Sequence, residues 1–398
     1  MVDQGCASAA TLITSLAVAR SAGADELAMF SIAFAAVLFS GSIYQALVAY
    51  PLTLLAAGGV ASVRLAHLAR LAQWHRWGAW WCVPLAGLAA LWPHHRLILV
   101  AVVACAAARA GVEFRRRSAY LNETPAVAVQ ASAWAHLPVL LAGSLVLLSG
   151  WLAHPVALNA LMALSLLAVG AAAGCLLTAR PGGTETPAAA RPVLVDHWRL
   201  GRWYLASLLA LWATNYAFGW YLAGRGDLRE AGYLHAARTL LGVPMAALLA
   251  FDSWFQPRAR EAWVAGGAHA LGRVVLQYAG LGTLVVAPCA LAMWWWPSFL
   301  ATTIFGSDFS GSGPALALTA WCAVLAVPDR LLGLLIVARQ APAGTALGFV
   351  ACLGLTTWLL PSWGAEGAAG CARLLALNAL AMVVVPGAWL ALRWRRLG

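Results

Sequence analysis

The chain has 398 residues, of which 63% are hydrophobic and 10% charged, and its formal net charge is +11. Soluble domains carry about a quarter charged residues, so this composition excludes an ordinary water-soluble protein and predicts one that spans a membrane. All 25 basic residues are arginines, which excludes a Walker-type phosphate loop and Schiff-base catalysis because both need a lysine.

Apolar runs separated by polar breaks predict membrane-spanning helices along nearly the whole chain. A helix needs about 20 apolar residues to cross a hydrocarbon core of about 30 Å. The sequence therefore predicts an all-α integral membrane protein with about twelve transmembrane helices. In chain order they are expected at 4–20, 27–50, 77–92, 97–114, 126–150, 154–178, 200–222, 231–254, 273–296, 315–337, 343–361 and 367–392.

The longest stretch outside these helices is 179–199, whose Pro, Gly and Thr content is typical of a linker. It predicts an N-terminal six-helix lobe at 1–178, a cytoplasmic linker and a C-terminal six-helix lobe at 200–398. Weak similarity at an offset of 204 positions, with Glu26 and Glu230 opening equivalent helices, suggests a duplication. Duplicated halves with a substrate site between them are a common transporter plan. The alternative is a set of helices without duplication.

The arginines also predict how the chain is oriented in the membrane. If the N-terminus is cytoplasmic, most arginines fall in loops on the inside, as the positive-inside rule requires. The loops on the outside then hold only Arg20, Arg96, Arg225 and Arg229. Both termini are therefore expected in the cytoplasm. Because the arginines follow the loops and form no continuous basic face, nucleic acid is not expected as a partner.

Three stretches carry a resemblance to a known family. They are DQGCASAATLITSLAVARSAGADELAMFSIAFA at 3–35, RAGVEFRRRSAYLNETPAVAV at 109–129 and PSWGAEGAAGCARLLA at 361–376. In order and spacing they resemble the opening, the stretch after the fourth helix and the start of the last helix of polysaccharide exporters. These exporters form a branch of the multidrug/oligosaccharidyl-lipid/polysaccharide (MATE-like) superfamily. One departure is Ala28, where the family has a glycine.

The resemblance implies a MATE-like fold of two six-helix lobes around a central cavity, which works by alternating access. It also implies a cargo, an undecaprenyl-diphosphate-linked oligosaccharide repeat unit. The unit would be flipped across the bacterial inner membrane for surface or exopolysaccharide assembly. Membrane lipids, a polysaccharide polymerase and the export machinery are then expected partners.

The eight cysteines lie singly, without Cys-x-x-Cys pairs, so no metal or cofactor site and no catalytic site is expected.

Arginines within the predicted spans are the candidates for substrate binding. A charge in the bilayer interior is costly, so it usually faces a cavity or a partner, and an arginine fork binds phosphate oxygens bidentately. The candidates are Arg109, Arg238, Arg330 and Arg373, with Arg20 at the outer end of the first helix. Each of them also has a structural alternative. Arg109 could pair with Glu113, Arg330 could belong to an ion pair, and Arg20 could anchor the interface.

Acidic residues in or near the spans are the candidates for ion coupling, and they are Asp252, Asp329 and Asp3. For Asp3 the alternative is placement at a helix N-terminus. Asn215 and Asn378 are expected to form interhelical hydrogen bonds.

Two other functions remain open at this point. A cation-coupled drug antiporter of the same fold is disfavoured because the spans hold more arginines than carboxylates. A membrane-embedded glycan-processing enzyme is disfavoured because the outer loops are short and contain no HExxH motif. No nucleotide site is visible, so the energy is expected from an ion gradient, the membrane potential or the substrate gradient.

Overall fold

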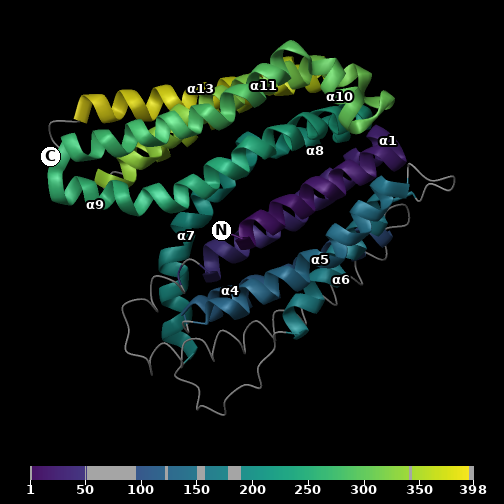
Figure 1. The fold of residues 1–398 in the computed structure, drawn as a ribbon, viewed down its shortest axis with the longest axis horizontal. Coiled ribbons are helices and arrows are strands. Elements are labelled where there is room, and N and C mark those ends of the chain that lie inside the picture. The colour runs from purple at the N-terminus through teal and green to yellow at the C-terminus, as the bar shows by residue number, and fades with distance from the viewer. Residues whose placement is uncertain are drawn as a thin grey trace. The chain divides into compact units, whose positions relative to one another are not determined.

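The computed structural model describes residues 2–49, 51, 96–121, 124–149, 157–177, 190–339 and 343–393. These residues form helices and short connections, without a β-strand in the described ranges (Figure 1). The elements of the first half are α1 (Val2–Tyr44), a π-helical turn η1 (Gln45–Ala49), α4 (Arg96–Leu121), α5 (Pro125–Ser149), α6 (Ala160–Leu177) and α7 (Ala190–Asn215). Those of the second half are α8 (Ala217–Gly224), α9 (Leu228–Trp295), α10 (Pro297–Phe305), η2 (Ser307–Ser312), α11 (Gly313–Arg339), α12 (Ala343–Trp363), η3 (Gly364–Glu366) and α13 (Ala368–Arg393).

Eight of the described helices are long and apolar enough to cross a membrane. The chain is therefore an all-α, multi-pass membrane protein, as expected. The predicted helix at 77–92 lies outside the described residues, and the total of about twelve spans stays a prediction.

Two of these helices are each long enough for two crossings and are broken at glycines. α1 has 43 residues and α9 has 68, against about 20 for one crossing. α1 breaks at Gly23 with φ 84°, and α9 breaks at Gly266 and Gly267, the second with φ 58°. Positive φ is costly for residues with a Cβ but not for glycine. Each break falls between two predicted spans.

The structure differs from the sequence prediction around α7. This helix begins at Ala190 and so includes the second half of the predicted linker 179–199. Pro192 does not prevent this, because proline is tolerated in the first turn of a helix, where its missing N–H has no partner to lose. The predicted helix 200–222 is also not continuous, because α7 ends at Asn215 and α8 starts at Ala217.

The chain divides into two compact units. The C-terminal unit holds residues 210–398 together with the short segment 23–28, and the N-terminal unit holds 2–22 and 29–209. The predicted lobe boundary at 179–199 stays a prediction.

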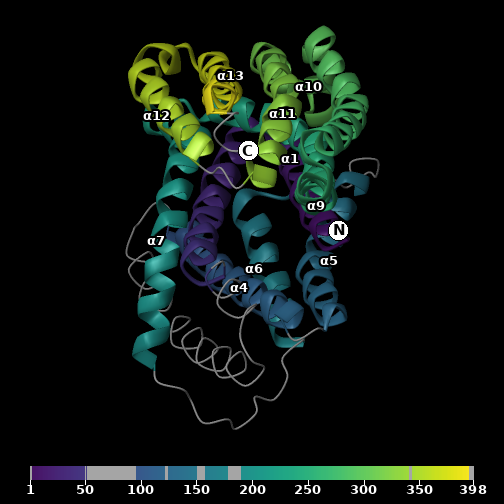
Figure 2. The same cartoon turned by 90° about the vertical axis from the view of Figure 1, so that its left-hand side faces the viewer.

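In the C-terminal unit α11 packs along α9 and α13, and α12 packs on α13 (Figure 2). Its core lies between the two halves of α9 and α11 and includes the fully buried side chains Leu248, Phe255, Leu271, Tyr278 and Leu334. This packing places the inner faces of α9, α11 and α13 around the site described below.

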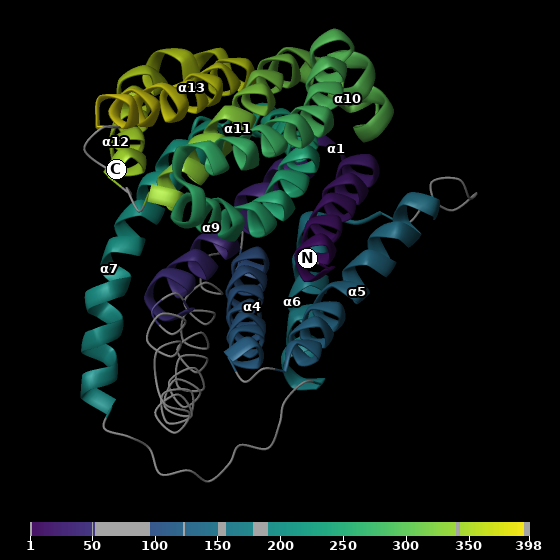
Figure 3. The same ribbon diagram turned by 60° about the vertical axis from the view of Figure 1, so that its left-hand side comes forward.

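In the N-terminal unit α4, α5 and α6 pack against one another (Figure 3). α6 approaches α5 closely at two glycines four residues apart in GAAAG, residues 170–174. A Cβ on Gly170 would collide with the carbonyl oxygen of Ala135, and one on Gly174 with that of Ala131. Small residues at this spacing let two membrane helices approach through their backbones.

We expect Gly170→Ala and Gly174→Ala each to lower the free energy of unfolding by about 1–3 kcal/mol, because the added methyl meets backbone rather than a movable side chain. The measurement is denaturant or thermal unfolding of the purified protein in detergent. Gly41→Ala in α1 is the control, since a Cβ at Gly41 meets nothing within 4 Å. Equal stability of all three variants would show that the α5–α6 contact is looser than described.

Candidate functional site

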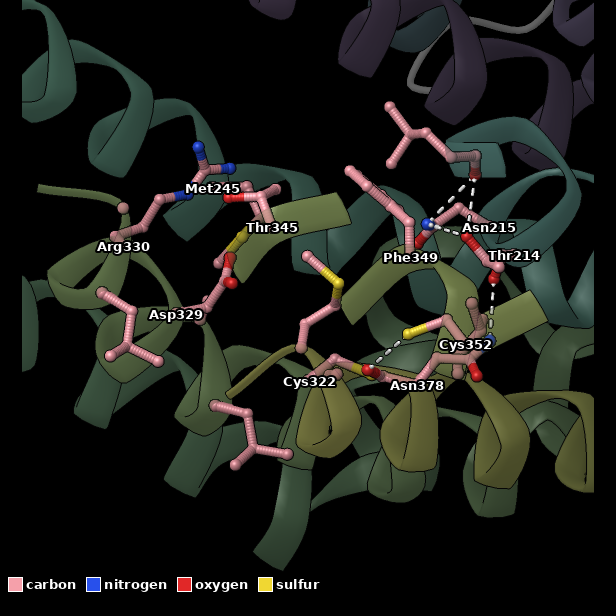
Figure 4. A pocket seen from close by; sticks show the side chains of 18 of the residues that line it. Thr214, Asn215, Met245, Cys322, Asp329, Arg330, Thr345, Phe349, Cys352 and Asn378 are labelled. Atoms are coloured by element: carbon pink, nitrogen blue, oxygen red, sulfur yellow. Dashed lines mark hydrogen bonds between the residues drawn. The ribbon is translucent and has the colours of Figure 1, made fainter. Parts of the chain in front are cut away.

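A cavity of about 560 Å³ lies within the C-terminal unit. Its walls come from α7, α9, α11, α12 and α13 (Figure 4). Much of the lining is apolar, and the polar and charged residues in it are Thr214, Asn215, Tyr216, Arg238, Asp252, Gln256, Asp329, Arg330, Thr345 and Asn378. Polar side chains inside apolar helices are normally turned towards such a cavity or towards one another.

The first charged group of the cavity is an ion pair between two helices. The carboxylate of Asp252 on α9 accepts a hydrogen bond at 2.8 Å from Nη1 of Arg330 on α11. Its other oxygen accepts one at 2.8 Å from the hydroxyl of Tyr278, which lies on the second half of α9. The Asp252 side chain is 8% exposed and that of Arg330 34%. Both oxygens of this buried carboxylate are therefore satisfied by protein groups.

The second charged group is Arg238 on α9, at the end of α7. Its Nη1 donates to the backbone carbonyl of Asn215 at 2.6 Å, and its guanidinium carbon lies 4.5 Å from the centroid of the Tyr216 ring. The carbonyl is available because α7 ends at Asn215, and the last carbonyls of a helix have no partner within it and favour a cation. No carboxylate pairs with Arg238 among the described residues.

The third charged group is Asp329, next to Arg330 on α11. It lines the cavity, is half-buried and has no hydrogen bond or ion pair within the described part of the chain. Pro328 precedes it inside the helix, where a proline leaves a backbone carbonyl of the preceding turn without its usual donor.

Asn378 on α13 links three helices beside the cavity. Its Nδ2 donates to the carbonyl of Thr214 at 3.0 Å and to the hydroxyl of Thr356 at 2.9 Å. The Cys352 thiol donates to its backbone carbonyl at 3.3 Å. The side chain is 4% exposed, and its Oδ1 has no hydrogen-bond partner in the described ranges. The interhelical hydrogen bonds predicted for Asn378 are confirmed.

The structure thus brings Arg238, Arg330, Asp252 and Asp329 together in one cavity. Arg330 is in an ion pair, the alternative left open above, but its partner Asp252 comes from another helix. The sequence reasoning missed Tyr278 and the break after Asn215. A polar Asn-Tyr pair within an apolar run was the signal that could have indicated this break.

The other candidate arginines lie elsewhere. In the N-terminal unit the guanidinium carbon of Arg109 lies 5.6 Å from the centroid of the Phe34 ring. Glu113, considered above as its partner, pairs instead with Arg116 at 2.7 Å and Arg117 at 2.9 Å. These contacts do not define an anion site around Arg109.

Arg373 and the two N-terminal candidates also lie outside the lining of this cavity. Arg373 pairs with Glu366 at 3.0 Å, and its side chain is 45% exposed. Arg20 is an exposed residue of α1. Asp3 lies in the first turn of α1, and the prediction for its side chain falls outside the described residues.

Comparison with known proteins gives structural matches only. No protein-family model and no curated protein matches the sequence. An inward-facing multidrug resistance MATE family transporter of the MOP superfamily matches with a TM-score of 0.71 and 11% identity, over 98% of this chain and 94% of that chain. The lipid II flippase MurJ in an inward closed conformation matches with a TM-score of 0.68 and 10% identity, over 98% and 86%. A MATE structure in the straight conformation matches with a TM-score of 0.59 and 12% identity, over 100% and 94%.

Proposed function

We propose that this chain, which has the all-α fold of MATE-type transporters and of the flippase MurJ, is a membrane transporter that works by alternating access. The proposed cargo is an undecaprenyl-diphosphate-linked oligosaccharide, flipped from the inner to the outer leaflet of the bacterial inner membrane. The three stretches that resemble polysaccharide exporters support this choice of cargo. A polymerase and export machinery would then receive the flipped unit.

The observation that carries the proposal is the state of Arg238. Its guanidinium lies in an otherwise largely apolar bundle, is held by a neutral carbonyl and an aromatic ring, and has no carboxylate partner among the described residues. A cation kept in this way is available to an anionic ligand, and the planar fork of an arginine matches phosphate oxygens. Arg330, which also lines the cavity and is 34% exposed, is already neutralised by Asp252.

The size of the cavity fits a head group rather than a whole lipid. Its volume of about 560 Å³ lies within the range of about 300–1,000 Å³ that is usual for small-molecule sites. A phosphate with its attached sugars can enter such a space. The polyprenyl chain would stay among the acyl chains, which are its favourable solvent.

Reconstitution tests the proposed activity directly. Proteoliposomes with the purified protein and a fluorescent polyprenyl-diphosphate oligosaccharide are treated with a glycan-cleaving enzyme that cannot cross the bilayer. We expect the protein to make lipids of the inner leaflet accessible, well above the rate in protein-free vesicles. If no imposed ion gradient or membrane potential raises the rate above that of protein-free vesicles, the proposal is wrong.

A cation-coupled drug antiporter is the second candidate, and one observation favours it. Asp329 offers a carboxylate in the same cavity without a partner in the described ranges, and a carboxylate attracts cationic drugs. The same vesicles loaded with a cationic dye separate the two functions. Gradient-driven dye efflux without lipid flipping would identify an antiporter, and the opposite result a flippase.

A further inference from the structure

The cavity has two ends of opposite charge. Arg238 and Asp252 are both on α9, and the helical rise over the residues between them places their backbones about 21 Å apart. In Figure 4 Asp329 and Arg330 lie at one side of the cavity, and Thr214 and Asn215 lie at the other. Arg238 belongs to the second side because it donates to Asn215. The two sides therefore differ in the groups that they present to a ligand.

The charges at each end do not cancel locally. The ion pair of Asp252 with Arg330 neutralises itself, so Asp329 is the carboxylate of this end that has no ion pair among the described residues. At the other end Arg238 leaves one positive charge. Arg238 and Asp329 form no ion pair with each other. Charges in a membrane-embedded cavity are costly unless a partner neutralises them, so a ligand with two opposite charges would satisfy both.

The hydrogen-bonding capacity of the lining agrees with this reading. A guanidinium can only donate and an ionised carboxylate can only accept. The matching ligand therefore has an acceptor-rich anion at one end and a positively charged donor at the other end. A phosphate joined to a sugar with a free amine has both features.

We propose that this cavity selects a zwitterionic head group, with its phosphate on Arg238 and a primary amine of the sugar on Asp329. The inference rests on the proposed function, since it assumes a phosphate-linked glycan as cargo. It adds the chemical class of the sugar, an amino sugar whose amine is not acetylated.

Binding of two matched lipids tests the inference. The purified protein in nanodiscs is titrated with polyprenyl diphosphate carrying glucosamine and with the same lipid carrying N-acetylglucosamine. We expect a preference of about tenfold or more for the free amine, because a charge-assisted hydrogen bond is lost on acetylation. Asp329→Asn should remove the preference, and Asp329→Glu should keep most of it. Glu261→Gln, an exposed carboxylate of α9, is the control and should bind both lipids like the natural protein.

Each other outcome contradicts a distinct claim. Equal binding of the two lipids by the natural protein, or an unchanged preference in Asp329→Asn, overturns the amine site but not the flippase. Equal weakening of both lipids in a folded Asp329→Asn variant also overturns it, since the carboxylate would then only support the cavity. If neither diphosphate lipid binds better than the uncharged polyprenol, the proposed function itself fails.

Discussion

Replacing Arg238 by Gln is expected to lower the affinity for polyprenyl-diphosphate glycans, and the flipping rate at low lipid concentration, by about 10- to 100-fold. Hydrogen bonds to charged groups contribute about 1.5–3 kcal/mol, and each 1.4 kcal/mol is about tenfold in binding. Glutamine is the suitable replacement because it keeps a polar, uncharged donor on a flexible side chain at this position while the guanidinium that donates to the Asn215 carbonyl is removed. The fold should therefore survive while the charge is lost.

Two further variants make this result specific. Arg238→Lys keeps the charge but not the planar fork, so an intermediate loss is expected. Arg258→Gln on the same helix is the matched control, because the exposed Arg258 stacks on Trp254, with its guanidinium carbon 3.4 Å from the ring centroid, and does not line the cavity. Lipid binding and thermal unfolding are measured on all three. Unchanged binding in a folded Arg238→Gln protein would remove the observation on which the flippase proposal stands.

Replacing Asp252 by Ala is expected to lower the free energy of unfolding by about 3–5 kcal/mol, the usual cost of removing one partner of a buried ion pair. The variant leaves the Arg330 guanidinium without its carboxylate and the Tyr278 hydroxyl, on a fully buried ring, without its acceptor. Most of the loss comes from the charge that stays behind rather than from the bond itself. Denaturant unfolding in detergent measures it.

A double variant separates the charge from the packing. Asp252→Ala with Arg330→Met removes both charges and keeps a straight side chain in place, so much of the lost stability should return. The control is Glu366→Ala, which breaks the Arg373 pair whose side chains are 45% and 46% exposed, and it should cost at most about 1 kcal/mol. If Asp252→Ala lowered the free energy of unfolding no more than this control does, the Asp252–Arg330 pair would behave as a solvent-exposed pair. The description of it as a buried ion pair would then be wrong.

The positions of the helices along the chain could be predicted from the sequence because hydropathy is a local property. The lengths of α5, α11, α12 and α13 follow the apolar runs, since a segment of about 20 apolar residues must cross the bilayer whatever its neighbours are. The ends of α7 could not be found in this way. The helix begins at Ala190, inside the predicted linker, and it ends at Asn215. Both ends depend on the elements that pack against them.

For the candidate site, too, some features follow from the sequence and others only from the packing. The sequence by itself determined that this is a membrane protein and that Arg238, Arg330, Asp252 and Asp329 are charges within apolar segments, because both follow from residue order alone. Only the tertiary structure decided which charges neutralise each other. Arg330 meets Asp252 from 78 positions away, and Arg373 meets Glu366, while Arg238 and Asp329 keep no charged partner in the described part of the chain. Pairing depends on which helix faces meet, and that is a property of packing rather than of sequence distance.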